Sequence, residues 1–364
     1  MAEFAGPDIR SIAFYLPQFH PIPENDGWWG MGFTEWTNVR AARPLFRGHH
    51  QPHVPGELGY YDLCDPAVRQ AQADLAVRYG IDAFCYHHYW FAGRRLLERP
   101  LDDVLASGRP DLPFCLSWAN EPWTRTWDGG DNDVLMPQHY SPEDDRRHID
   151  WLIEAFRDDR YVRLDGKPLF LVYRAGVLPD PVATTRLWRE RVARAGFPGL
   201  FLCRVESHFE RDDPLPLGFD AAVEFQPAFG QMRLDWRTRF RPGRVLARLE
   251  LAPPSASYVA VDYAQLVARM SGRPQPTFPR FPCVTPDWDN TARRPGGAHL
   301  LRDSSPELFG GWVGAVADGL RAAPPERRLL FVNAWNEWGE GCHLEPCARW
   351  GVGYLEAFAK AIAG

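Results

Sequence analysis

Two glutamates stand three residues apart in the stretch Asn336-Glu337-Trp338-Gly339-Glu340-Gly341, the part of this sequence richest in groups that can do chemistry. The stretch follows an apolar run, Leu329-Leu330-Phe331-Val332, which predicts a buried strand. Because strand side chains alternate between two faces, we expect Phe331, Asn333, Trp335 and Glu337 to share one face. Two carboxylates so close together, among tryptophans and glycines, indicate acid/base chemistry on an uncharged polyol.

The acid and the base of such a pair need different protonation states at one pH. Burial beside Trp335 and Trp338 would raise the pKa of a carboxyl group, which a general acid requires. We expect Glu337, among polar neighbours, to stay ionised, and Glu340, in the turn, to be the desolvated acid. The alternatives are a structural ion pair, as for many strand-end glutamates, and a catalytic pair made of Glu121 and Glu337. The interpretation fails if either carboxylate of the first pair points to bulk solvent, or is locked against an arginine with no opening for a sugar.

The elements that must position these groups alternate along the chain. Strands are expected at 10–20, 82–90, 112–120, 167–174, 200–206, 221–226, 281–290 and from 329 onward. Helices are expected at 66–79, 94–107, 141–157, 181–195, 258–270, 306–323 and 353–363. With no Gly-rich phosphate turn, this order predicts an α/β fold, a single (β/α)₈ barrel of the TIM type with long loops after the strands. We expect one domain over residues 1–364, in which the basic, aperiodic segment 231–256 is an insertion.

Polar residues gather at the carboxyl ends of the predicted strands, the face that carries the site in such barrels. We expect Arg204 and Glu206 to face inward, and His87 and His88 to face opposite ways. The fifteen tryptophans, most of them in loops, suit a saccharide cleft because indole faces cover large apolar areas. The residues expected to bind substrate are Tyr15, Trp28, Trp29, Glu35, Trp36, His87, His88, Trp118, Asn120, Glu121, Trp123, Glu206, Glu224, Gln226, Asp287, Trp335, Asn336 and Trp338.

Composition narrows the kinds of partner. With 41 basic and 47 acidic residues, the net charge of −6 gives no basic footprint for nucleic acid or for an anionic membrane. The sequence has no apolar run of 18 residues and no signal-peptide pattern at its start, so we predict a cytoplasmic location without membrane insertion. An oligo- or polysaccharide is the expected partner, while the oligomeric state stays open.

The seven cysteines include no C-x-x-C pair, which favours free thiols in a reducing compartment. Cys342, His343 and Cys347 invite a metal-site interpretation. It is the weaker one, because no second cluster supplies the remaining ligands of a zinc site. We therefore expect neither a metal nor a cofactor.

Five sequence runs stand out together: 13–20, 32–39, 59–63, Trp118-Ala119-Asn120-Glu121-Pro122-Trp123 and Asn336-Glu337-Trp338-Gly339-Glu340-Gly341. They resemble the WbsX-type family, whose members occur with polysaccharide and O-antigen biosynthesis clusters and are often labelled glycosyltransferases. The resemblance covers nearly the whole chain. The family is in turn similar to glycoside hydrolase family 99, with which this sequence shares chiefly the last run.

The resemblance to that hydrolase family implies a metal-free (β/α)₈ barrel and retaining cleavage of an α-mannoside-type bond. It also implies a route in which the sugar's own 2-hydroxyl attacks and gives a 1,2-anhydro intermediate. Glu337 would then be the base that removes the 2-hydroxyl proton, and Glu340 the acid that protonates the leaving oxygen and later activates water. The sequence departs from the hydrolase pattern at Gly339, where histidine is usual, and at Cys342-His343, where threonine and glutamine are usual.

Three functions follow from these observations. The first is a retaining glycoside hydrolase acting on a bacterial polysaccharide or a mannoside-like glycan. The second is a glycosyltransferase of O-antigen or other polysaccharide biosynthesis, although Asp131-Asn132-Asp133 is a poor candidate for a metal-binding Asp-x-Asp turn. The third is a noncatalytic saccharide-binding protein, in which the same tryptophans bind and the glutamates only accept hydrogen bonds.

Overall fold

The structure, a computed structural model, describes residues 8–125, 130–207, 210–231, 242–294 and 296–364. Within these residues, parallel strands form a ring whose members follow the order of the sequence. The strands are β1 Arg10–Tyr15, β2 Ala83–Phe91, β4 Phe114–Trp118, β8 Lys167–Val172, β9 Phe201–Val205, β10 Ala221–Val223, β12 Arg280–Phe281 with β13 Cys283–Val284, and β15 Leu329–Val332. Each predicted strand is therefore present, although most are shorter than their apolar stretches.

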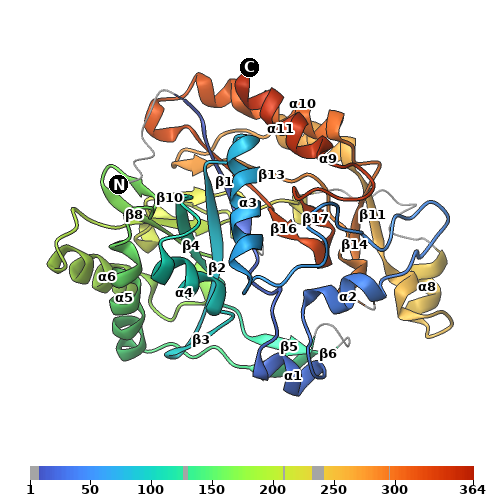
Figure 1. The fold of residues 1–364 in the computed structure, drawn as a ribbon, viewed down its shortest axis with the longest axis horizontal. Coiled ribbons are helices and arrows are strands. Elements are labelled where there is room, and N and C mark those ends of the chain that lie inside the picture. Colours follow the sequence, from blue (N-terminus) through green and yellow to red (C-terminus); the bar gives the residue numbers. More distant parts are fainter. Residues whose placement is uncertain (1–7, 126–129, 208–209, 232–241, 295) are drawn as a thin grey trace.

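The seventh strand of the barrel is interrupted at Pro282. Its first half, β12, pairs with β10, and its second half, β13, pairs with β15. The Pro282 carbonyl still accepts a bond from the Phe331 amide at 2.9 Å, so the ladder runs past the interruption. Because β15 also pairs with β1, the ring closes, and the predicted (β/α)₈ barrel is confirmed. Figure 1 labels β1, β2, β4, β8, β10 and β13 of this ring.

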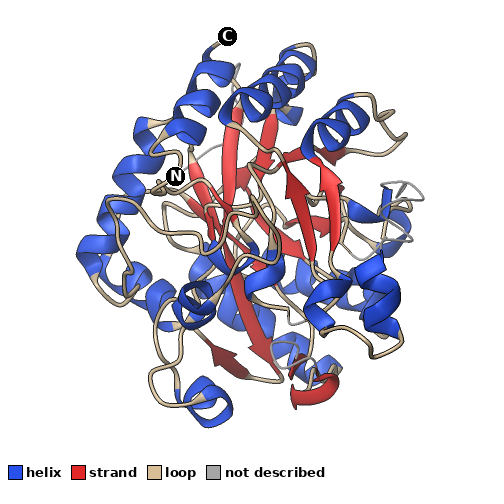
Figure 2. Cartoon of the chain, turned by 90° about the vertical axis from the view of Figure 1, so that its right-hand side faces the viewer, coloured by secondary structure: helices blue, strands red, loops and turns tan. Residues whose placement is uncertain are grey.

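Helices surround the ring, as the view in Figure 2 shows. They are α3 Pro66–Arg78, α4 Arg99–Ser107, α5 Pro142–Phe156, α6 Pro181–Arg194, α9 Tyr263–Ser271, α10 Pro306–Arg321 and α11 Gly353–Ala363. Four of them begin with the same two-residue signal, in which an Asp or Ser caps the first turn and a proline follows: Asp65, Ser141, Asp180 and Ser305. Between β9 and β10, the described residues form only the 3₁₀ turn η3 Leu215–Leu217.

Two of the predicted helices start later than expected. Residues Arg94–Leu96 form strand β3, which turns back at Gly93 (φ 92°) and pairs antiparallel with β2. Residues Val259–Asp262 form β11, which pairs with β14 His299–Arg302. In each case an extended segment finds a neighbouring strand to pair with, and this pairing depends on contacts that local helical periodicity does not report.

Part of the predicted insertion, residues 232–241, lies outside the described residues. The remainder contains helix α8 Pro242–Arg248 and the 3₁₀ segment η5 Pro254–Ser257, which are in contact with each other. Neither the insertion nor the extent of a single domain over 1–364 is tested by this arrangement.

Long loops extend the barrel at the carboxyl ends of its strands. They contain helices α1 Pro23–Trp29 and α2 Glu35–Ala41, the hairpin β5 Trp123–Arg125 with β6 Gly130–Met136, and the short pair β16 Asn336–Glu337 with β17 Cys342–His343. In Figure 1, α1 and the β5–β6 hairpin lie together below the barrel. The Trp123 ring lies 5.7 Å from Phe91, the last residue of β2, so this hairpin covers the carboxyl end of β2.

A chain of phenylalanine rings marks which strand residues face the inside of the barrel. Phe14 lies 5.7 Å from Phe331, Phe331 lies 6.4 Å from Phe281, and Phe281 lies 6.2 Å from Phe201. Because neighbouring strand residues face opposite ways, the residues next to these point outward, toward the helices. This alternation of inward and outward side chains decides which of the predicted site residues can reach a site inside the barrel.

Four aromatic residues predicted to bind substrate point outward, toward the helices: Tyr15, His88, Trp118 and Trp335. The first three lie on barrel strands, and Trp335 follows the end of β15. The Tyr15 hydroxyl donates to Gln72 of α3 at 2.7 Å, and His88 Nε2 lies 3.0 Å from His148 Nε2 of α5. Trp118 lies 6.0 Å from Trp188 of α6, and Trp335 lies 5.1 Å from Phe84, both centroid to centroid. All four fill the layer between barrel and helices, which corrects the prediction that they face the cleft.

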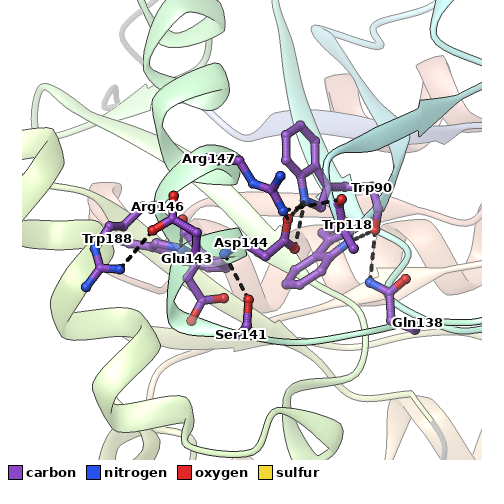
Figure 3. A network of polar contacts seen from close by, with 11 residues as sticks. Trp90, Trp118, Gln138, Ser141, Glu143, Asp144, Arg146, Arg147 and Trp188 are labelled. Carbon is purple, nitrogen blue, oxygen red and sulfur yellow. Dashed lines mark hydrogen bonds and ion pairs between the residues drawn. The ribbon is translucent and has the colours of Figure 1, made fainter.

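Figure 3 shows this layer at the start of α5. The Trp90 indole donates to both carboxylate oxygens of Asp144, at 3.2 and 3.0 Å. The Trp90 carbonyl in turn accepts from the Trp118 indole at 3.2 Å and from Gln138 at 2.9 Å. The two tryptophans therefore tie β2 and β4 to α5, which explains why Trp118 is unavailable to a ligand.

The polar residues Glu206, Glu224 and Gln226 also lie on the outer side of the ring, contrary to the predicted inward orientation of Glu206. Arg273, which follows α9, contacts Glu206 at 2.9 Å and Glu224 at 2.7 Å. Gln226 is buried, and its side-chain oxygen accepts from the Ala228 amide at 2.9 Å. Phe225, between them, faces inward instead, 5.5 Å from Phe14. These three polar residues hold the structure together and do not line the cleft.

We expect the substitution Arg273→Met to lower the free energy of unfolding by about 1–3 kcal/mol, because it leaves the two buried carboxylates with the longer contacts to Arg280, at 3.9 and 3.3 Å. Urea unfolding followed by circular dichroism measures the change. The control Arg194→Met removes an exposed pair with Glu190 on α6 and should alter stability by no more than about 0.5 kcal/mol. Equal effects of the two substitutions would contradict a structural role for Glu206 and Glu224.

Candidate active site

A cavity of about 320 Å³ opens at the carboxyl ends of the barrel strands. Seven predicted site residues line it: Trp28, Trp29, His87, Glu121, Trp123, Glu337 and Glu340. Further lining residues, which were not predicted, include Gln18, Asn25, Tyr89, Tyr173, Phe225, Trp288, Asn290, Arg293 and Arg294. The volume lies at the lower end of the range of small-molecule sites, and the lining combines aromatic rings with several polar groups, as in most such sites.

Indole rings from separate loops form part of the cavity wall. Trp28 and Trp29 come from α1, Trp123 from the β5 hairpin, and Trp288 from the segment after β13. The Trp28 and Trp123 rings meet edge to face, 6.0 Å apart. The wall is thus built from loop tryptophans, and not from Trp335 and Trp338 beside the carboxylates, as the sequence had suggested.

Glu337 reaches the cavity through a change of direction after the last barrel strand. β15 ends at Val332, so the two-residue period that linked Phe331 to Glu337 does not continue that far. Asn336 fixes the new course, because its side-chain amide accepts from the Leu16 amide at 2.7 Å and donates to the Leu16 carbonyl at 3.0 Å. Asn336 is therefore a backbone clamp, and Glu337 next to it faces the cavity.

Glu340 lies in the 3₁₀ turn η8 Trp338–Glu340, which ends at Gly341. The Glu340 carbonyl accepts from the Asp289 amide at 2.6 Å. Gly341 has φ 60°, and a Cβ atom there would lie 3.0 Å from the Asp289 backbone and side chain. Only glycine meets both the left-handed conformation and the close approach, so the turn that carries Glu340 is tightly specified.

One guanidinium joins the two carboxylates. Arg293 Nη2 lies 3.0 Å from Glu337 Oε2, and Arg293 Nη1 lies 3.0 Å from Glu340 Oε1. The exposed fractions of the side chains are 16% for Arg293, 8% for Glu337 and 20% for Glu340. Both carboxylates contact an arginine, but both also line an open cavity, so the condition that would exclude a sugar site is not met.

Burial raises the pKa of Glu337 and also that of Glu340. Arg293 lowers both pKa values, while the nearby Glu35 carboxylate raises them, and the net shift of each is upward. The expectation that Glu340 alone is desolvated is therefore wrong, because burial raises the pKa of both carboxyl groups. Because the two carboxylates interact with each other and with one cation, they titrate together as a pair.

His87 stands beside Glu337, with 3.6 Å between Nε2 and Oε1. Burial, and secondarily Arg293, lower the pKa of His87 to about 4, so the ring is neutral at pH 7. The contact is for this reason not an ion pair. The imidazole is stacked on Phe14, 5.8 Å between ring centres, and offers an uncharged polar edge to the cavity.

Trp36 and Trp338 support the Glu340 turn from behind and do not line the cavity. The Trp338 ring stacks on His343 with 3.6 Å between centroids, and its indole donates to Glu345 Oε2 at 2.6 Å. Trp36 lies 5.5 Å from Trp338 and donates to the Tyr61 carbonyl at 2.8 Å. Both residues, predicted as substrate contacts, are parts of the core that holds the turn in place.

Asn120 is a second backbone clamp, equivalent to Asn336 on the other side of the cavity. Its amide donates to the Arg174 carbonyl and accepts from the Arg174 amide, both at 2.8 Å. Glu121, the next residue, lines the cavity and contacts Arg174 Nη1 at 2.7 Å. Glu121 thus contacts a different arginine from Glu337. The alternative catalytic pair, Glu121 with Glu337, therefore lacks the shared guanidinium that links Glu337 to Glu340.

Two predicted acidic contacts lie elsewhere. Asp287 lines a separate cavity of about 370 Å³, because residues 287–290 form a wall whose alternate residues face different sides, with Trp288 and Asn290 on the active-site side. Glu35 is fully buried behind the lining and contacts Arg293 Nε at 2.6 Å. Neither side chain lines the cavity that contains Glu337 and Glu340.

Arg293 is the most consequential residue that the sequence analysis missed. It lies in the loop after the seventh strand, within Arg293-Arg294, and barrel architecture brings that loop to the same face as Glu337. Two adjacent arginines at that position were a usable signal. Nothing in the sequence, however, indicated that the first of them would contact both carboxylates.

Metal and membrane features can be stated for the described part of the chain. No group of three or more His, Cys, Asp or Glu side chains there is arranged to hold a metal ion. All seven cysteines are free thiols, and the Cys342 thiol donates to the Asn333 carbonyl at 2.8 Å. Among the helices of these residues, none has the length and apolar character needed to cross a bilayer.

Comparison with known proteins gives one family and one fold. The family model described as "Glycosyltransferase WbsX" matches residues 11–358. Two curated relatives, both called "Uncharacterized protein WxcX" and from two strains of Xanthomonas campestris pv. campestris, are 45% identical over 352 residues, or 96% of this chain. The match takes up 49% of each relative, so the chain spans about half the length of the curated relatives it matches.

The solved structures most useful for comparison are carbohydrate-active barrels. A "Glycoside hydrolase-like protein" superimposes with a TM-score of 0.59 at 17% identity, covering 98% of this chain and 95% of that one. A GH99 endo-alpha-mannosidase from Bacteroides thetaiotaomicron gives a TM-score of 0.57 at 16% identity, with 97% and 96% coverage. At these identities the likeness establishes the fold.

The raised pKa of Glu337 predicts a pH-dependent cost of folding. Above the ordinary carboxyl pKa of 4.5, the unfolded chain loses this proton while the folded chain retains it, so the stability of the native protein should fall as the pH rises from about 5 to about 8. Glu337→Gln has no such proton, and its free energy of unfolding should rise relative to wild type over the same range, by up to about 1.4 kcal/mol per pH unit.

Urea unfolding at several pH values measures this difference. The control is Glu154→Gln on α5, where the carboxylate is 73% exposed, and its difference from wild type should stay flat with pH. A flat difference for Glu337→Gln as well would show that Glu337 titrates as an ordinary surface carboxyl group.

Proposed function

The chain belongs to the family described as Glycosyltransferase WbsX, and from that premise we propose that it is a glycan-acting enzyme, a retaining glycoside hydrolase. Its proposed substrate is a bacterial polysaccharide or a mannoside-like glycan. The observation that carries the proposal is the pair Glu337 and Glu340, held on two nitrogens of one guanidinium in a cavity with tryptophan walls. Such a pair can hold one proton and accept another, as glycosidic bond cleavage requires.

The cavity chemistry favours a neutral sugar as the group that is bound. Apolar C–H faces of a pyranose fit the indole surfaces of Trp28, Trp29, Trp123 and Trp288. Hydroxyl groups find polar partners in residues such as Asn290 at the lining. The lining contains three glutamates against two arginines, which gives no excess of positive charge for a strongly anionic ligand.

We propose the following route, in which the residue roles follow the pattern of the family 99 hydrolases. The reactive form of the pair has one proton, on Glu340, and an ionised Glu337. In the first step Glu337 takes the proton of the sugar 2-hydroxyl, O2 forms a bond to C1, and the bond from C1 to the leaving oxygen breaks. Glu340 gives its proton to that oxygen. In the second step Glu340 takes a proton from water, the water oxygen bonds to C1, the C1–O2 bond breaks, and Glu337 returns its proton to O2.

Two features of the site support this route. The atoms that exchange protons with protein, O2 and the leaving oxygen, are attached to neighbouring carbons, and two carboxylates that share one guanidinium can serve such closely spaced atoms. The carboxylates also exchange roles as donor and acceptor between the steps, which suits a coupled pair whose pKa values burial has raised. Two inversions at C1 give net retention of configuration.

A glycosyltransferase is the second candidate, favoured by the description of the family. In that reaction an acceptor sugar hydroxyl would take the place of water in the second step. Calorimetry with sugar nucleotides separates the two, because micromolar binding of a sugar nucleotide would favour the transferase. A noncatalytic saccharide-binding protein would instead keep an oligosaccharide bound and uncut through a long incubation.

We expect Glu337→Gln and Glu340→Gln each to lower the rate of glycan cleavage by about 10²–10⁴-fold while leaving glycan binding intact, since each removes one proton-transfer group. Incubation with defined α-mannose-containing and bacterial polysaccharides, followed by mass spectrometry of released oligosaccharides, measures the rate. Nuclear magnetic resonance (NMR) of the fresh product reports its anomeric configuration. Glu154→Gln serves as the control, and full activity in either site variant would refute the assignment.

A further inference from the structure

Gly339 lies between the two residues of the candidate catalytic pair, and the structure shows what its missing side chain leaves room for. A Cβ atom at residue 339 would lie 1.7 Å from Glu35 Oε1, 2.8 Å from Glu35 Cδ and 2.9 Å from Arg293 Nε. Its φ angle is not among the positive values found at other glycines, so the backbone conformation does not itself demand glycine here. The space is needed for the Glu35 carboxylate.

Glu35 comes from a distant part of the chain and is delivered by a fixed element. It is the first residue of α2, whose start is secured by reciprocal bonds between Thr34 and Thr37. The next residue, Trp36, is buried against the Glu340 turn, and the Glu35 amide donates to the Gln18 carbonyl at 3.1 Å. The carboxylate therefore enters the site from a hydrogen-bonded helix terminus, on a different loop from Arg293.

Arg293 uses a different nitrogen for each of three carboxylates. Nε donates to Glu35 Oε1 at 2.6 Å, the shortest of the three contacts, while Nη2 and Nη1 contact Glu337 and Glu340 at 3.0 Å. A guanidinium is planar, so fixing Nε and its plane also fixes the directions of both terminal nitrogens. Glu35 is fully buried, and no second hydrogen bond is formed by its other oxygen within the described protein, so Arg293 is its principal partner.

We propose that Glu35 is a positioning residue that orients Arg293 toward both Glu337 and Glu340. We also propose that residue 339 is glycine because a side chain there would displace the Glu35 carboxylate. This inference rests on the proposed acid/base roles of Glu337 and Glu340. It assigns to Glu35 no contact with substrate, because the side chain does not line the cavity. Any larger side chain at residue 339 would occupy the place of the Glu35 carboxylate.

The arrangement also has an electrostatic consequence. Three carboxylates surround one guanidinium, so full ionisation would leave excess negative charge in a buried site. Part of the positive charge of Arg293 is engaged by Glu35, and less is available to stabilise the ionised forms of Glu337 and Glu340. Replacing Glu35 by a neutral residue of the same shape should therefore make the catalytic pair more acidic.

The test is a titration that needs no substrate. In protein labelled with ¹³C at the glutamate side-chain carboxyl, NMR follows the signals of Glu337 and Glu340, which are assigned by their loss in Glu337→Gln and Glu340→Gln. We expect Glu35→Gln to lower the titration midpoint of the pair by about one pH unit or more. The exposed control Glu154→Gln should leave the midpoint unchanged. An unchanged midpoint in Glu35→Gln would overturn the role of Glu35.

The role of Gly339 is tested by a double-substitution cycle, in which the thermal unfolding midpoint Tm is measured for each variant. Gly339→Ala alone should lower Tm, because the new Cβ displaces Glu35. In a Glu35→Ala background the same substitution should cost no more than half as much, since the group it displaces is gone. Gly314→Ala on α10, where a Cβ meets nothing within 4 Å, controls for glycine replacement as such. Equal costs in the two backgrounds would overturn the role of Gly339.

The two proposals fail in distinguishable ways. If glycan cleavage is found, its acid and basic pH limits should shift downward in Glu35→Gln together with the NMR midpoint, while the Glu154→Gln profile stays fixed. If no glycan is cleaved but the midpoint still shifts, the proposed function fails and the positioning role stands. If cleavage is found and the midpoint does not shift, the reverse holds.

Discussion

A single buried guanidinium shared by three carboxylates is the constraint around which this site is built. Charges removed from water are costly unless they are paired and hydrogen-bonded, and here one cation, Arg293, must serve Glu35, Glu337 and Glu340 together. The three acids come from the loop after the first strand and from the turn after the last, while the cation comes from the loop after the seventh. The cluster therefore depends on the barrel being closed, and the loops beyond the strands gain their mutual orientation from it.

Backbone clamps give this cluster its rigidity. Asn336 fixes the chain to Leu16, and Asn120 fixes it to Arg174, so the glutamate that follows each asparagine is presented to the cavity from an immobilised peptide. Glu345 supports the same turn through the Trp338 indole. A site held in this way has little freedom to adjust, which is the usual condition for precise proton transfer.

The sequence predicted the order of strands and helices well, because apolar runs, Asp-Pro or Ser-Pro helix starts and strand-end polar residues are local signals. It also predicted correctly that Glu337 and Glu340 line one cavity. The orientation of several strands was predicted less well, since parallel barrel strands are buried on both faces and their composition does not show which side faces inward. Glu206 and Trp118 were misplaced for this reason. Arg293 could not be assigned its role, because its contacts arise between loops that only the closed ring brings together.

Barrel closure has a consequence for how the protein is made. The strand β15 is hydrogen-bonded to both β1 and β13, and it is the last barrel strand to be synthesised. Until it is in place, the nascent ring has two open edges that can pair with other chains. Glu337 and Glu340 follow directly after this strand. A ribosome-bound chain that still lacks its final strand thus has neither a closed sheet nor a complete cluster of carboxylates around Arg293. The candidate site therefore forms only with the step that also removes the open sheet edges.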